Sequence, residues 1–153
     1  MSHTSQIRDA LKSDIQALLN IENDVFHAEA WSHDVFESEF ALLGTTRVYK
    51  VIEQNQVIIG YFGLAIVDGI IDITTIAVQS EYQHQGFGTV MMNEIMEISK
   101  QYKARKVMLE VKPENVAAIS LYQKYGFEVI GLRRNYYGPS KDALTMQKVV
   151  SNV

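Results

Sequence analysis

The sequence predicts a mixed α/β domain, built on a mixed but mostly antiparallel sheet of about six to seven strands with helices on both faces. Three observations predict this fold. The chain has 153 residues, two prolines and no repeat or linker, which favours one domain over residues 1–153. Apolar, β-branched runs meet at Asp68-Gly69, which indicates an antiparallel meander. The C-terminal half then alternates strand-like and helix-like segments, which indicates a sheet covered by helices.

The N-terminal half predicts two helices followed by the meander. Apolar residues at helical spacing follow Asp14 and Ser32, so these two residues are the expected helix caps. Asp68-Gly69 is a strong hairpin signal because both central positions of a type I′ turn need positive φ. The expected strands are a short one at Ile7-Arg8, then 47–53, 57–67 and 70–78, with a turn at Gln54-Asn55.

The C-terminal half predicts two further helices and three strands. Residues 86–102 carry an apolar stripe at helical spacing, and 106–111 form a strand that Pro113 ends. Asn115 is a good cap for a helix through 125, which Gly126 closes. The expected final strands are 127–132 and 143–150.

Composition narrows the function. The net charge of −4 argues against broad nucleic-acid binding, which needs a basic surface. Without cysteine the chain has no thiol nucleophile and no disulfide, and its four histidines show no metal spacing, so we expect no metal. No apolar run approaches the roughly 20 residues of a membrane span, and the polar N-terminus does not resemble a signal peptide. We therefore expect a cytoplasmic protein with no membrane partner.

A glycine-rich loop, Gln83-His84-Gln85-Gly86-Phe87-Gly88, separates an expected strand from an expected helix. Its glycines let the backbone approach an anion, and the first N–H groups of the helix can bind phosphate. The dinucleotide fingerprint fails because Met91 takes the place of its third glycine, and the Walker loop fails because Thr89 stands where lysine is needed. The loop favours a phosphate-bearing ligand, although a tight connection alone would also need two glycines.

This loop, after a strand ending in Ile76-Ala77-Val78, resembles motif A of the GNAT acetyltransferase superfamily. Further segments resemble its ribosomal-protein-alanine N-acetyltransferase (RimI-type) branch, and the resemblance covers residues 7–150. It implies a single GNAT domain with a sheet splayed at the middle. The segments are Leu109-Glu110-Val111, Asn115-x-x-Ala118-x-x-Leu121-Tyr122, Tyr125-Gly126-Phe127 and Arg133-Arg134-Asn135-Tyr136-Tyr137.

The resemblance implies acetyl-CoA as co-substrate. The strand backbone at Ile76, Ala77 and Val78 is expected to pair with the pantetheine amides, and an N–H near Val78 to polarise the thioester carbonyl. Asn115 matches another coenzyme-contacting position, and it can also be a plain helix cap. The expected pyrophosphate loop comprises His84, Gln85, Gly86, Phe87, Gly88 and Thr89.

Acetyl transfer to an amine needs a base for the ammonium and a proton for the departing thiolate. The resemblance places Glu110 at the base position and Tyr122 at the acid position. From the pattern alone, Glu110 reads as a solvent-facing residue of a strand, and Tyr122 reads as a core residue of a helix. No acetylated enzyme is required, which fits direct transfer through a ternary complex and the absence of cysteine.

The acceptor site rests on three aromatic residues. In the RimI-type branch the segment with Tyr136 and Tyr137 helps to form a peptide groove, and Trp31 is expected to form the opposite wall. Paired tyrosines before Gly138-Pro139 can equally form a hydrophobic plug in a loop. Two departures put the peptide preference in doubt: Ala30 stands where the branch has proline, and the loop 138–142 is short, with Lys141 at a usually acidic position.

The leading hypothesis is an N-α-acetyltransferase acting on protein N-termini, above all the N-terminal alanine of a small-subunit ribosomal protein. It would be a monomer or a weak dimer. A GNAT enzyme for small amines or lysine side chains is the first alternative. A non-catalytic acyl-CoA-binding module is the second.

Overall fold

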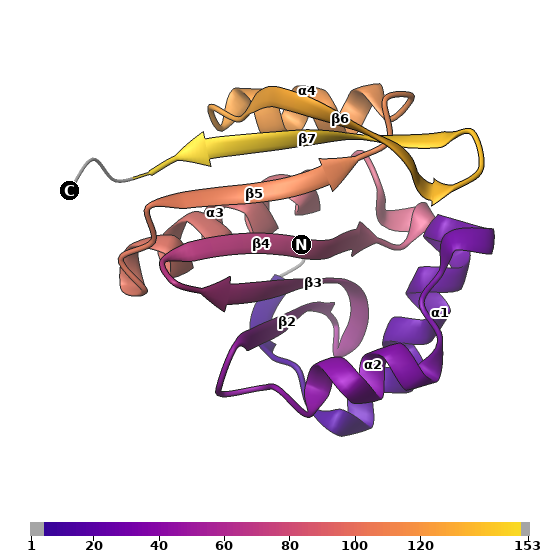
Figure 1. Cartoon of the computed structure of the whole chain (residues 1–153). Coiled ribbons are helices and arrows are strands. Elements are labelled where there is room, and N and C mark those ends of the chain that lie inside the picture. Colours follow the sequence, from indigo (N-terminus) through magenta and orange to yellow (C-terminus); the bar gives the residue numbers. More distant parts are fainter. Residues whose placement is uncertain (1–4, 151–153) are drawn as a thin grey trace. The chain divides into compact units, whose positions relative to one another are not determined.

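A computed structural model describes residues 5–150 (Figure 1). Seven strands form one sheet in the order β1-β2-β3-β4-β5-β7-β6. The pairs β1–β2, β2–β3, β5–β7 and β6–β7 are antiparallel, and β4–β5 is parallel, which confirms the mixed, mostly antiparallel sheet. None of the helices within these residues is long and apolar enough to cross a membrane.

The described chain divides into two compact units. Unit 1 comprises residues 5–65 and 75–91, and unit 2 comprises 66–74 and 92–150. Three elements, β3, β4 and α3, run from one unit into the other. The elements in chain order are β1 (Ser5–Asp9), η1 (Lys12–Asp14), α1 (Ile15–Phe26), η2 (His27–Glu29), α2 (His33–Phe40), β2 (Arg47–Gln54), β3 (Val57–Val67), β4 (Ile70–Val78), η3 (Ser80–Tyr82), α3 (Phe87–Gln101), β5 (Lys106–Val111), α4 (Val116–Lys124), β6 (Glu128–Gly138) and β7 (Lys141–Val149).

Unit 1 has its core between helices α1 and α2 and one face of the strands (Figure 1). Leu18 and Phe36, from the two helices, are fully buried. They belong to one cluster with Tyr49 of β2, Tyr61 of β3 and Ala77 of β4. This side of the strands is therefore closed to ligands by the two helices.

The two helix caps differ in outcome. The Ser32 hydroxyl accepts from the Val35 N–H at 3.3 Å, which confirms it as the cap of α2. Asp14 is the N-cap residue of α1, as predicted, but its side chain makes no capping bond to the helix: the carboxylate accepts from the Leu11 N–H at 2.7 Å and pairs with Arg8 at 2.8 Å. The carboxylate thus stabilises the short turn η1, from which α1 continues.

The turns follow from residues that tolerate positive φ. Asp68 and Gly69 have φ of 53° and 76°, as the hairpin prediction requires. The preceding turn lies at Asn55-Gln56, with φ of 53° and 66°, one residue later than predicted. Asparagine tolerates this conformation well, and it takes the first central position of the turn.

Unit 2 contains the β6–β7 hairpin, drawn in orange and yellow in Figure 1, and the parallel pairing of β4 with β5. That pairing joins Ile70–Ile73 to Lys106–Leu109, whereas β4 continues to Val78. The prediction that β6 ends at Leu132 is wrong, since the strand runs to Gly138 and includes Tyr136 and Tyr137. Its register shifts between Arg133 and Gly138, where Asn135 has a φ of 57°.

Candidate active site

The predicted phosphate loop lies in unit 1, between η3 and α3. His84 and Gly86 have φ of 63° and 91°. A Cβ added at Gly86 would meet no atom within 4 Å, so the space beside this backbone is open. The first N–H groups of a helix have no partner within the helix, and they stand at the positive end of its dipole. The loop with the start of α3 therefore fits an anion such as a pyrophosphate.

Glutamine side chains brace this loop. The Gln83 amide donates to the Val78 carbonyl at 2.9 Å, and the Gln85 amide donates to the Glu81 carbonyl at 3.2 Å. Phe87 is buried, with its ring centre 6.4 Å from that of Tyr82, so Phe87 offers a ligand its backbone rather than its ring. His84, Gln85 and Thr89 are exposed.

The end of β4 also lies in unit 1. Ala77 is buried in the core cluster, whereas Ile76 and Val78 are half-buried. Because side chains alternate along a strand, Ile76 and Val78 face away from the side that α1 and α2 cover. They are the two side chains of this segment that can reach a ligand.

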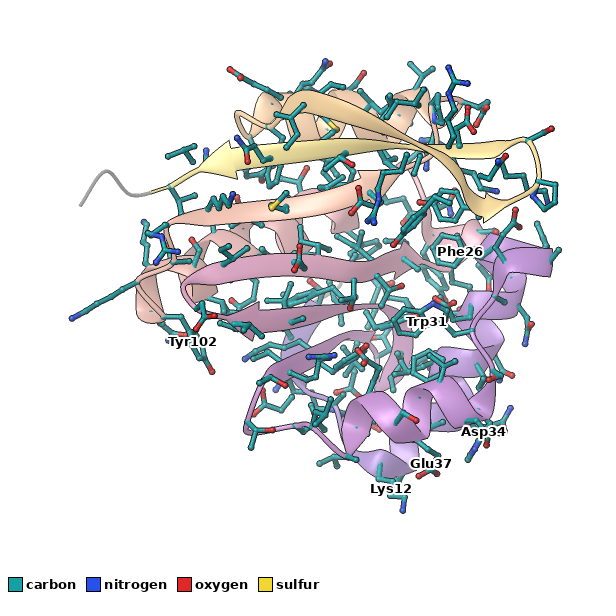
Figure 2. The ribbon with its side chains drawn as sticks, viewed as in Figure 1. Lys12, Phe26, Trp31, Asp34, Glu37 and Tyr102 are labelled. Carbon is teal, nitrogen blue, oxygen red and sulfur yellow. The ribbon has the colours of Figure 1, made fainter. Side chains whose placement is uncertain are left out.

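Trp31 lies in the segment that joins α1 to α2 (Figure 2). Its N–H donates to the Glu22 carboxylate at 2.9 Å. Its ring packs edge-on against Phe36, with centroids 5.5 Å apart, and is partly buried. Trp31 is therefore held at both backbone and ring, and the residue remains partly exposed.

Glu110 lies on β5 in unit 2, where Val107, Leu109 and Val111 point into the core. Its side chain, on the alternate face, is only 18% exposed. The Thr145 hydroxyl donates to one carboxylate oxygen, and an Arg133 nitrogen lies 3.6 Å from the other. Glu110 is thus an oriented, partly desolvated carboxylate rather than a freely solvated one.

Aromatic and cationic side chains surround this carboxylate. The Arg133 guanidinium lies 5.0 Å from the Tyr136 ring centre, and the Tyr136 and Tyr137 rings pack edge-on at 4.9 Å. The Lys112 ammonium lies 5.5 Å from the Tyr137 ring centre. Partial burial, and then the charge of Glu110, raises the pKa of Tyr136. The two tyrosines are part of strand β6 rather than of a loop. Because Tyr136 is 48% exposed, this side chain does not form a buried plug.

Tyr122 lies on α4, also in unit 2, and is 6% exposed. Its ring centre lies 6.0 Å from that of Phe127. Burial, with a smaller contribution from Tyr137, raises the pKa of the Tyr122 hydroxyl well above its usual value. The phenol therefore keeps its proton throughout the neutral range, as a hydrogen-bond donor must.

Asn115 caps α4, because its side-chain oxygen accepts from the Ala118 N–H at 3.2 Å. The cap role is thus confirmed, and the amide nitrogen is the part that remains for a ligand.

The sequence did not point to Thr145, which lies directly opposite Glu110 in the β5–β7 register. Alternation along β7 is visible in the sequence, but the register that pairs these two residues is not.

The predicted site residues are divided between the units. The phosphate loop, the end of β4 and Trp31 belong to unit 1, and Glu110, Asn115, Tyr122, Tyr136 and Tyr137 belong to unit 2. Within unit 2, chains of contact join Glu110 through Arg133 to the tyrosine pair. Across residues 5–150, no three His, Asp or Glu side chains gather as metal ligands would.

A family model of the acetyltransferase (GNAT) family matches residues 15–127 of the chain. The chain belongs to this family. GNAT acetyltransferases use acetyl-CoA, and the open backbone at Gly86, at the start of α3, fits the anionic part of that molecule.

Relatives of nearly the same length narrow the family further. A Bacillus subtilis protein, provisionally named a ribosomal protein bS18-alanine N-acetyltransferase, is 35% identical over 147 residues, covering 95% of this chain and 96% of the relative. The ribosomal protein bS18-alanine N-acetyltransferase of Escherichia coli K12 is 31% identical over 145 residues, covering 91% and 93%. These names support an N-acyltransferase enzyme rather than a non-catalytic binding module.

Solved structures agree with the fold. The crystal structure of the ribosomal-protein-S18-alanine N-acetyltransferase from Escherichia coli matches this GNAT chain with a TM-score of 0.89 and 28% identity, over 98% of this chain and 96% of that one. A spermidine N-acetyltransferase chimera matches with a TM-score of 0.81 and 22% identity, over 95% of both chains. The second match shows the fold alone.

Proposed function

We propose that this GNAT enzyme is an acetyl-CoA-dependent N-α-acetyltransferase of protein N-termini, and that its substrate is the N-terminal alanine of a small-subunit ribosomal protein. The full-length similarity to the Escherichia coli bS18-alanine N-acetyltransferase carries this proposal. Fold alone does not select the substrate, since a spermidine enzyme has a similar fold.

In this proposal Glu110 removes the proton that the acceptor ammonium must lose before its nitrogen can attack. An α-amino group has a pKa of about 7.7–8.0, so deprotonating the ammonium costs little free energy near neutrality and more at lower pH. Thr145 holds one oxygen of the carboxylate, which leaves the oxygen near Arg133 for the ammonium or a bridging water. Arg133 is 58% exposed, so it can turn into solvent as the ammonium arrives.

Tyr122 acts on the departing sulfur. The acetyl thioester of acetyl-CoA supplies the acetyl group, whose carbonyl carbon gains the bond to nitrogen and loses the bond to sulfur. The raised pKa of Tyr122 makes its hydroxyl a weaker acid than an ordinary thiol, whose pKa is near 8.5. Tyr122 therefore stabilises the thiolate by donating a hydrogen bond. The nitrogen gives its second proton to solvent as the amide forms, and the thiolate takes a proton from solvent.

The remaining proposed roles concern binding. The backbone at Ile76, Ala77 and Val78 pairs with the pantetheine amides, the loop 84–89 binds the pyrophosphate, and the Asn115 amide contacts the coenzyme. Tyr136, Tyr137 and Trp31 contact the first residues of the acceptor. Transfer is direct, with both substrates bound at once, because the acceptor nitrogen attacks the thioester itself and no acetylated side chain is required.

A substrate panel tests the proposal, with thiol release from acetyl-CoA as the measurement. The panel holds short peptides that begin with alanine, serine or methionine, one peptide with a blocked N-terminus and a free lysine, and spermidine. We expect turnover on free alanine ends that blocking abolishes. Turnover only on lysine or spermidine would overturn the assignment to protein N-termini.

A further inference from the structure

Unit 1 contains a buried carboxylate that the proposed chemistry does not use. Glu22, in helix α1, is 1% exposed. It accepts three hydrogen bonds: from the Trp31 N–H at 2.9 Å, from the Thr75 hydroxyl at 3.2 Å and from the Tyr61 hydroxyl. A buried carboxylate is tolerated only when hydrogen-bond donors satisfy it, so Glu22 depends on these three partners.

Aromatic packing through a further residue, Phe36, links Trp31 back to Tyr61 and so closes a ring of contacts with Glu22. The Trp31 ring lies 5.5 Å from Phe36, and Phe36 lies 5.9 Å from the Tyr61 ring, whose hydroxyl returns to Glu22. Phe36 and Tyr61 are fully buried. The ring of contacts therefore fixes Trp31 both through its backbone and through its side chain.

Helix α1 is also tied to both ends of the segment 76–78. Thr75, a partner of Glu22, directly precedes that segment. Asp24, two residues after Glu22, accepts from the Ser80 N–H at 2.7 Å. One helix thus holds the position of Trp31 relative to the strand end that the proposed function gives to the coenzyme.

We propose that Glu22 is a positioning residue for the acceptor: it fixes Trp31 against unit 1 through the Trp31 N–H, so that the ring is preset for the peptide N-terminus. The inference rests on the proposed function for the role of Trp31. The residue acts through hydrogen bonding, not through its charge. Glutamine, which keeps one acceptor oxygen and can donate to the two hydroxyls, should therefore replace it, and alanine should not.

Trp31 provides the readout, because it is the only tryptophan of the chain. In Glu22→Ala we expect stronger acrylamide quenching and a red shift of Trp31 emission. We also expect the KM for an alanine-ended peptide to rise about tenfold, the change that corresponds to one ordinary hydrogen bond, with kcat and the KM for acetyl-CoA little changed. Glu22→Gln should restore both wild-type emission and wild-type KM.

Leu64→Ala is the matched control, since Leu64 of β3 is fully buried in unit 1 but lies outside the cluster that contains Phe36 and Tyr61. It should leave Trp31 quenching and the peptide KM unchanged. Should Glu22→Ala fail to fold, Glu22→Leu combined with Tyr61→Phe and Thr75→Val removes the carboxylate and two hydroxyls together, which leaves fewer unpaired groups.

A folded variant without the carboxylate that keeps wild-type quenching and KM would overturn the inference. A Glu22→Gln variant as impaired as Glu22→Ala would overturn it too, because the charge would then be the essential feature. If the wild-type protein acetylates no peptide, the proposed function fails, and Trp31 quenching alone then decides whether Glu22 fixes Trp31.

Discussion

At the scale of single residues, the orientation of Glu110 distinguishes it from a surface carboxylate. Thr145 fixes one oxygen, and the strand holds the side chain at 18% exposure. We expect Glu110→Gln to lower kcat roughly 100-fold, a usual contribution of a general base. The loss should be largest below about pH 7, where the acceptor is almost wholly ammonium. Thiol release from acetyl-CoA, followed from about pH 6 to about pH 9, measures this loss.

The matched control for Glu110 is Glu128→Gln, the same replacement at an exposed position of β6. Glu128 lies opposite Gln147, so the change leaves the surroundings of Glu110 intact. It should leave kcat and its pH dependence unaltered. A Glu110→Gln enzyme with wild-type turnover at low pH would remove Glu110 from the role of base.

Tyr122 contributes to the packing of the core and, in the proposed function, to catalysis, and a single variant separates these two roles. Tyr122→Phe removes only the hydroxyl and keeps the ring against Phe127. We expect turnover to fall at least about tenfold, the effect of losing one hydrogen bond to a charged sulfur, while the urea midpoint changes little. Tyr125→Phe removes a hydroxyl that bonds to Asn93 at 2.6 Å near the end of the same helix, and it should retain full turnover. Equal activity of the two variants would assign Tyr122 to the core alone.

At the scale of elements, the loop before α3 can be tested with a pair of glycines. Gly86 and Gly44 have φ of 91° and 84°, and a Cβ at either would meet no atom within 4 Å. Alanine should therefore destabilise both by a similar amount, about 1 kcal/mol, through the backbone alone. Only Gly86→Ala should raise the KM for acetyl-CoA, because it alone lies in the anion loop. An equal KM for the two variants would argue against phosphate binding there.

The elements also show how far sequence reasoning reaches. Asp68-Gly69 fixed both the turn and the bounds of β3 and β4, because the positive φ it needs is a local requirement. Asp14 occupies the N-cap position of α1, as predicted, but its carboxylate binds Arg8 of β1 and the Leu11 N–H rather than the first turn of the helix. The extension of β6 through Tyr136 was missed because the strand is exposed and lacks alternation. The pairing of β6 with β7, whose register the sequence does not encode locally, sets this bound.

At the scale of the whole molecule, the same limit applies to the candidate site. Motif resemblance predicted its residues one by one, including Glu110 and Tyr122. It did not predict the hydrogen bond from Thr145, or Arg133 between Glu110 and Tyr136, since both depend on the register of strands β5, β7 and β6. Glu22 escaped for a related reason: a glutamate in an amphipathic helix reads as solvent-facing, and only the tertiary structure buries it.

The titratable groups of both units also predict how stability depends on pH. Hydrogen bonds from Arg8 lower the pKa of Asp14, and those from Ser80 lower the pKa of Asp24. In the unfolded chain these carboxylates bind protons first, near pH 4, so stability should fall as the pH drops below about 4. Asp14→Asn should reduce this acid dependence in urea unfolding.

Buried tyrosines determine how the stability of the fold changes at alkaline pH. Burial raises the pKa of both Tyr61 and Tyr122, with a further contribution at Tyr61 from the charge of Glu22. Above about pH 10 the unfolded chain loses these protons while the folded chain keeps them, so the stability present below pH 10 is lost as the pH rises. Tyr122→Phe should make this decline shallower in urea midpoints measured from about pH 8 to 11. The exposed Tyr102→Phe should leave it unchanged, and an identical decline in Tyr122→Phe would show that Tyr122 ionises in the folded protein as readily as in the unfolded chain.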